Sequence, residues 1–89
     1  GQEKKEIIAA NIDLTGVDND AFWKHYDQYE KQRQEIGASK LELLQKYTTK
    51  PGNLTNFQAS ELLGEAVTLR IAEDKLILNY TKIIGKAIS

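Results

Sequence analysis

The chain has 89 residues, with twelve Lys+Arg against thirteen Asp+Glu, and no basic block is dense enough to drive binding to a phosphate backbone. It has no Cys, which excludes a disulfide framework and a thiolate metal site, and no apolar run approaches the ~18 residues of a membrane span. We therefore expect a single charged, helical domain over residues 1–89, with no nucleic acid as partner and no membrane insertion.

Three helices are predicted, over about residues 3–11, 16–47 and 56–87, because apolar residues fall at helical spacing and no stretch alternates as a strand does. The first helix spans only ~15 Å at ~1.5 Å per residue, whereas the third runs for nearly ~50 Å. We expect the first helix to use Ile7, Ile8 and Ile12 to cover one end of the longer helices, near Trp23 and Ile84.

The second helix carries a seam of side chains at alternating three- and four-residue steps, which is typical of packed antiparallel helices. The seam consists of Phe22, Tyr26, Tyr29, Arg33, Ile36, Lys40, Leu43 and Tyr47. Gly37-Ala38-Ser39, followed by Glu42, also matches a helix stop and a new capping box. Because the seam passes this point without a change of phase, we expect one continuous helix, with a bend near Gly37 as the alternative.

A Leu-Thr motif precedes each long helix. In Leu54-Thr55-Asn56-Phe57-Gln58, Thr55 is placed to cap the helix while Gln58 reaches back to the cap amide, which is a capping box. Leu14-Thr15-Gly16-Val17-Asp18 repeats the arrangement, with Asp18 in the role of Gln58. The only proline lies in the turn cluster Thr48 to Asn53, which separates the two long helices.

The third helix has a seam that matches the second, formed by Ala59, Leu62, Ala66, Leu69, Glu73, Leu76, Tyr80, Ile83 and Ala87. Folding the chain at Pro51-Gly52 sets Phe22 opposite Ile83 and Leu43 opposite Leu62. In this register Arg33 lies opposite Glu73, so that the charges interrupting the two seams would form an ion pair. The predicted fold is all-α: a long antiparallel hairpin of helices 16–47 and 56–87, with the short N-terminal helix packed at the open end.

The third helix has more apolar surface than one partner helix can cover. Leu63, Val67 and Ile71 point away from the seam and lie beyond the reach of the short first helix. Soluble monomers seldom expose contiguous apolar patches, because burying each aliphatic side chain is worth ~1.5–3 kcal/mol. We predict that these three residues, together with Trp23, bind a protein partner, and that a homodimer is the simplest way to cover them.

The sequence shows no set of residues for catalysis or for metal binding. His25 is the only histidine, and its neighbours at three and four residues offer no second ligand. The acidic pairs Glu73-Asp74 and Asp18-Asp20 fit a seam charge and helix-start charges better than a catalytic dyad. Isolated glycines make no phosphate-binding loop. We therefore predict no catalytic residue, no cofactor and no metal, and expect the protein not to be an enzyme.

The capping motif carries a family resemblance. Leu54-Thr55-Asn56-Phe57-Gln58 is similar to the LTxxQ signature of the Spy/CpxP-like family, whose members are periplasmic helical hairpins linked to envelope stress, ATP-independent chaperoning and metal tolerance. The stretch Ala21–Glu30 also resembles small secreted proteins of Bacteroidetes-type bacteria, in which a Leu-Thr motif precedes an FWxxYxxY-like helix. The resemblance implies an exported protein, periplasmic or secreted, whose signal peptide has been removed ahead of Gly1.

The function expected from these features is that of an exported, non-enzymatic helical protein that binds other proteins through apolar helix surface, with a chaperone-like role in envelope stress. The alternative is a structural or regulatory module that binds one defined partner. A metal-resistance sensor is a third hypothesis, and the presence of only one histidine disfavours it.

Overall fold

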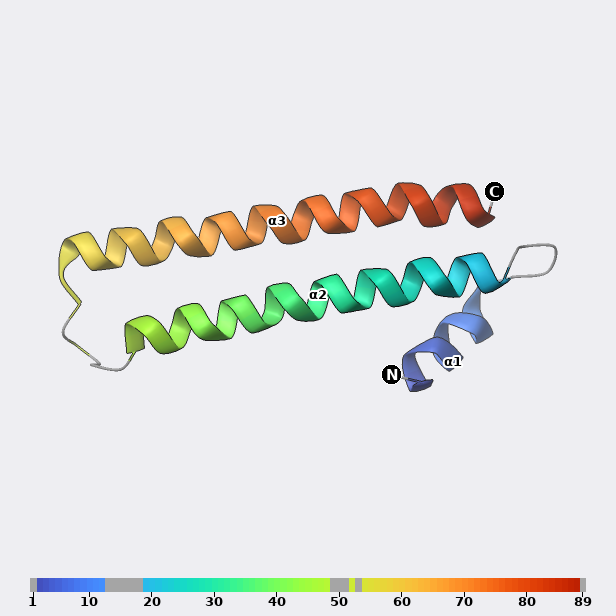
Figure 1. Cartoon of the computed structure of the whole chain (residues 1–89), viewed down its shortest axis with the longest axis horizontal. Coiled ribbons are helices and arrows are strands. Elements are labelled where there is room, and N and C mark those ends of the chain that lie inside the picture. The colour runs from blue at the N-terminus through green and yellow to red at the C-terminus, as the bar shows by residue number, and fades with distance from the viewer. Residues whose placement is uncertain (1, 13–18, 49–51, 53, 89) are drawn as a thin grey trace.

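The structure, a computed structural model, describes residues 2–12, 19–48, 52 and 54–88. These residues form three helices, α1 (Gln2–Asn11), α2 (Asn19–Thr48) and α3 (Asn56–Ile88), and no strand. Helices α2 and α3 run antiparallel and side by side, and α1 lies beside the first half of α2 at the open end (Figure 1). The molecule measures 57 × 23 × 17 Å. The predicted all-α hairpin with a short N-terminal helix at its open end is confirmed.

Helix α2 continues without a break through Gly37 for 30 residues. The hydroxyl of Ser39, which a new cap would use, instead donates to the carbonyl oxygen of Glu35 at 3.2 Å. Ile36 and Leu43, on either side of this point, are both half-buried. The prediction of one continuous helix is confirmed, because contacts of the seam on both sides hold the backbone in one phase.

Helix α3 begins at the predicted capping box. The Thr55 amide donates to Gln58 Oε1 at 3.0 Å, and the Gln58 amide donates to Thr55 Oγ1 at 3.1 Å. These two bonds satisfy amides that have no partner within the first helical turn. The matching motif at Thr15 and Asp18, and the predicted helix residues 16–18, lie outside the described part of the chain.

The buried core is small and mostly aromatic. Its members all belong to the two predicted seams: Phe22, Tyr26, Tyr47, Leu76 and Tyr80. Phe22 is 2% exposed, and the rings of Tyr29 and Tyr80 lie 5.7 Å apart across the two helices. The aromatic packing therefore concentrates at the open end of the hairpin.

The ion pair between the seams does not involve the predicted cation. Lys40 Nζ lies 2.5 Å from Glu73 Oε2, whereas Arg33 Nη1 lies 3.4 Å from Glu30 Oε1 of its own helix. The prediction that Arg33 pairs with Glu73 is therefore wrong. Lys40 is one heptad beyond Arg33, or about two turns at ~3.6 residues per turn, so it occupies the next equivalent position of the same seam.

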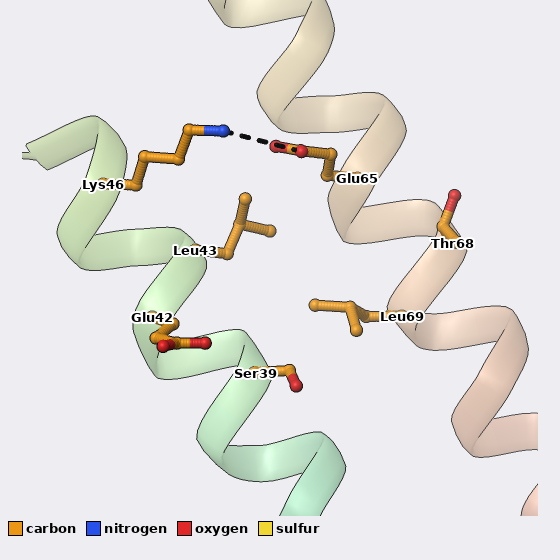
Figure 2. A pocket seen from close by; sticks show the side chains of 7 residues that line it. All are labelled: Ser39, Glu42, Leu43, Lys46, Glu65, Thr68 and Leu69. Atoms are coloured by element: carbon orange, nitrogen blue, oxygen red, sulfur yellow. Dashed lines mark ion pairs between the residues drawn. The ribbon is translucent and has the colours of Figure 1, made fainter.

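A second pair shows the same displacement. Leu43 and Leu69 point toward one another across the space between α2 and α3 (Figure 2), whereas Leu62 was the predicted neighbour of Leu43. Helix α3 begins farther out than α2 ends (Figure 1), so the two helix ends are not level. In these two pairs the facing residue is one heptad away from the predicted one, which fits the offset of α3 along α2.

Candidate protein-binding surface

Three aliphatic side chains form a continuous exposed line along α3. Leu63, Val67 and Ile71 are 66, 54 and 48% exposed, and their four-residue spacing places them on one face of the helix. We call these three residues the outer stripe. Leu69 and Leu76 of the same helix are half-buried and buried, because they belong to the face that packs against α2. The expectation that the outer stripe stays exposed in a single chain is confirmed.

The exposed apolar surface is larger than the sequence led us to expect. On α3 it includes Leu78, which is 56% exposed and lies beyond Asp74, and Phe57, which is 72% exposed. On α2, Leu41 and Leu44 are 58 and 53% exposed, and neither was among the predicted site residues.

A simple signal could have identified Leu41. It lies about five turns after Trp23 at ~3.6 residues per turn, so the two side chains share a face of α2. Helix α1 reaches that face only near Trp23, where Lys5 Nζ lies 5.6 Å from the centre of the Trp23 ring. The same face is therefore covered near the open end and left bare near the turn.

Trp23 does not join the outer stripe. It is half-buried, and its ring meets those of Phe22 and Tyr26 edge-on at 4.9 and 5.5 Å. It lies near the start of α2, whereas the outer stripe lies on the first half of α3, toward the opposite end of the hairpin (Figure 1). The structure thus brings together three of the four predicted binding residues and places Trp23 in the packing around α1.

A cleft of about 500 Å³ lies between α2 and α3 in the turn half of the hairpin (Figure 2). Its lining residues are Ser39, Glu42, Leu43, Lys46, Glu65, Thr68 and Leu69. Lys46 Nζ approaches Glu65 Oε1 to 3.8 Å, and the hydroxyl of Thr68 donates to the carbonyl oxygen of Gly64 at 2.9 Å. The ammonium group of Lys46 and the hydroxyls of Ser39 and Thr68 therefore have partners within the protein.

Glu73 and Tyr47, both in the interface between α2 and α3, have displaced pKa values. The hydrogen bond from Lys40, and then its charge, hold the pKa of the Glu73 carboxyl below its ordinary value. Burial raises the pKa of the Tyr47 hydroxyl, and the carboxylates of Glu65 and Glu61 add to this rise. Both shifts move the pKa further from neutral pH, whereas the pKa of an efficient general acid or base lies close to the working pH.

No metal centre or membrane span is found in the described ranges. No three side chains of His, Cys, Asp or Glu lie together as a metal ion would need. His25 is half-buried, and its Nδ1 atom has no hydrogen-bond partner among the residues that the structure describes. Of the helices in the described part of the chain, none combines the length and apolar character needed to cross a membrane.

Comparison of the chain with family models, with curated proteins and with solved structures gives no match.

Proposed function

We propose that the protein is a non-enzymatic binding protein that uses the outer stripe to contact other proteins. The observation that carries the proposal is the continuous exposure of Leu63, Val67 and Ile71 on one face of α3, between 48 and 66%. Full burial of an exposed aliphatic side chain is worth ~1.5–3 kcal/mol, and these three are about half exposed, so covering each would gain roughly half of that and together they favour association.

A second helix is the partner element that fits this surface. Side chains at four-residue intervals form a ridge that packs into the groove of another helix. Charged residues of both signs border the outer stripe and are exposed, namely Arg70, Asp74 and Lys75. They would form the polar rim that surrounds the apolar centre of a typical protein interface.

Self-association through the outer stripe is the simplest form of this binding. A two-fold dimer brings the same three residues of two chains together, and symmetric dimers are the commonest soluble oligomers. Partner binding at the same stripe would compete with the dimer.

The cellular part of the proposal rests on the LTxxQ resemblance and on the Thr55–Gln58 capping box that it contains. We propose an exported protein, periplasmic or secreted, with a chaperone-like role toward unfolded proteins in envelope stress. An exposed apolar stripe without a deep pocket suits a chaperone because it accepts many apolar segments without requiring one shape.

The experiment compares Val67→Glu with Ala72→Glu. Val67 lies in the middle of the outer stripe, whereas Ala72 is an exposed position of α3 on a different face, so the two variants add the same charge to the same helix. Both are expected to keep the helical content of the parent protein by circular dichroism. Sedimentation velocity measures self-association, and light scattering measures protection of several unrelated unfolded proteins from aggregation.

We expect Val67→Glu to weaken self-association or client protection about tenfold, which corresponds to the loss of ~1.4 kcal/mol, and Ala72→Glu to leave both unchanged. Protection of many clients supports the chaperone-like role. Protection of none, with a dimer that Val67→Glu disrupts, points to the single-partner module. The binding proposal fails if Val67→Glu changes neither measurement.

A further inference from the structure

A second surface feature, separate from the outer stripe, is a cavity of about 450 Å³ beneath α1. All three helices contribute to its walls. Four aromatic rings from α2 and α3 line it, namely Phe22, Tyr26, Tyr29 and Tyr80, and Ile8 of α1 and Ile84 of α3 close its sides. Helix α1 therefore borders the aromatic groove of the hairpin on one side, through Ile8.

The wall of this cavity is uncharged. Among the described residues that line it, none carries a charge. The two hydroxyls that α3 contributes, those of Tyr80 and Thr81, have hydrogen-bond partners within the protein. Gln32 Nε2 donates to the Tyr80 hydroxyl at 3.1 Å, and the Thr81 hydroxyl donates to the carbonyl oxygen of Ile77 at 2.7 Å. Burial, followed by the charge of Glu30, raises the pKa of Tyr26, which keeps its phenol neutral. A charged ligand would lose its hydration here and gain no counter-charge.

The dimensions and the backbone of the walls limit the kind of molecule that fits. An apolar cavity of ~150 Å³ takes up benzene, so one about three times as large holds two or three fused rings. Residues of α2 and α3 on these walls are helical, so their amides are already bonded within the helices. A bound polypeptide would find few partners for its own backbone groups, which favours a small molecule over a peptide.

Helix α1 is held loosely enough to let such a molecule enter. Lys5 Nζ lies 2.7 Å from Asp27 Oδ1, and Lys4 Nζ lies 3.6 Å from Glu30 Oε2. Ion pairs with exposed members contribute little to stability, and no residue of α1 is buried. The outer wall of the cavity can therefore move while the hairpin stays folded.

We propose that the cavity beneath α1 binds an uncharged apolar molecule the size of two or three fused rings, with α1 as its movable wall. This site is independent of the outer stripe. It lies in the open half of the molecule, and its aromatic residues belong to the interface of the hairpin.

Gly85 provides a direct test, because it lines the cavity and a Cβ atom built on it meets nothing within 4 Å. Gly85→Leu would extend a side chain into the cavity, and it replaces a glycine inside a helix by a better helix former, so the fold is not weakened. Gly64→Leu is the matched control. It makes the same change in the same helix, at a glycine that also has open space around it and does not line the cavity.

The probe is N-phenyl-1-naphthylamine, an uncharged apolar fluorophore that brightens when it leaves water. Energy transfer from Trp23, the only tryptophan, reports where the probe binds, because the Trp23 ring contacts those of Phe22 and Tyr26. We expect saturable binding with energy transfer from Trp23, weakened at least about tenfold in Gly85→Leu and unchanged in Gly64→Leu. Thr81→Phe, which fills the cavity from the same wall, should act like Gly85→Leu.

Three results would overturn the proposal. One is the absence of saturable binding to the parent protein, and another is equal affinity in Gly85→Leu and the parent. The third is loss of binding in Val67→Glu with retention in Gly85→Leu, which would place the probe on the outer stripe. Because Gly85→Leu leaves the outer stripe intact, its effect on the probe is separate from the dimer and client measurements.

Discussion

The open half and the turn half of the hairpin are built differently, although α2 and α3 run through both. In the open half, aromatic rings from α2 and α3 pack together, and α1 lies beside α2 as a third helix that borders them through Ile8. In the turn half only two helices are present, Tyr47 is the buried residue, and aliphatic side chains such as Leu44 and Leu63 are more than half exposed. Side chains are therefore packed more deeply in the open half, and more apolar surface is exposed in the turn half.

The difference shows what a third helix contributes to so small a fold. Two helices bury only the side chains along their shared seam, whereas a third helix covers a groove between them. Helix α1 has 10 residues against the 33 of α3, so it supplies this cover at one end only. The uncovered end is where we place protein binding, and the covered end is where we place the small-molecule site.

The largest effect should come from removing the aromatic core of the open half. Phe22→Ala should lower the free energy of unfolding by ~3–5 kcal/mol, because Phe22 is 2% exposed and its loss leaves a cavity. Leu69→Ala, at a half-buried position of the turn half, should cost only ~1–2 kcal/mol. Urea unfolding measures both, and Phe57→Ala at a 72% exposed position is the control, expected within ~0.5 kcal/mol of the parent. Equal losses in Phe22→Ala and Leu69→Ala would show that the two halves are packed alike.

A smaller effect is expected at the start of α3, where the turn half depends on its capping box. Thr55→Ala removes the oxygen that accepts from the Gln58 amide and should cost ~1 kcal/mol in urea unfolding, with faster amide exchange in the first turn. Ser60→Ala, which removes an exposed hydroxyl from within the same helix, should change stability by less than ~0.5 kcal/mol. We expect Thr55→Ala to retain client protection. Loss of protection at unchanged stability would mean that the Leu-Thr motif itself contacts partners.

The smallest effect concerns the ion pair between the two helices and tests the register. The pKa of Glu73 is lowered in the folded protein, so its pairing with Lys40 stabilises the fold above the unfolded pKa of about 4.5. This contribution is lost as the pH falls through the lower, folded pKa. Thermal unfolding of Lys40→Met should therefore show a lower midpoint than the parent at pH 7, and the difference should shrink as the pH falls below about 4.5.

Arg33→Met is the matched control for this measurement, since Arg33 affects Glu73 only through its charge and pairs with Glu30. It should show a weaker pH-dependent difference than Lys40→Met. A stronger one would restore the register in which Arg33 faces Glu73.

The predicted ion pair of Glu73 shows how much of the register between α2 and α3 the seam patterns can determine. Glu73, Arg33 and Lys40 all interrupt the seams, and the structure pairs Glu73 with Lys40 instead of the predicted Arg33. The choice failed because a heptad pattern matches itself after a slide of seven residues, so apolar spacing alone allows both registers. The ends of α2 and α3 are offset in the folded chain (Figure 1), and the observed ion pair belongs to the register with that offset.

Some features of the candidate binding surface could likewise be predicted from the sequence, and others could not. The exposure of Leu63, Val67 and Ile71 follows from their spacing and from the short length of the first helix, and both can be read from the sequence. The bare position of Leu41 depends on which face of α2 is covered by α1, and only the folded chain shows that. The position of α1 on the hairpin also creates the cavity beneath α1, and no pattern in the sequence predicts this cavity.

The sequence by itself determined the features that arise within one helix: where α3 begins, the continuity of α2 through Gly37, and the face that each helix buries. These features follow from bonds and caps between residues only three or four positions apart. Only the tertiary structure decided how far α3 slides along α2, which groove α1 covers and what space remains beneath it. Those features depend on the fit of side chains far apart in the sequence, such as the rings of Tyr29 and Tyr80 and the pair of Lys40 and Glu73, which no local rule determines.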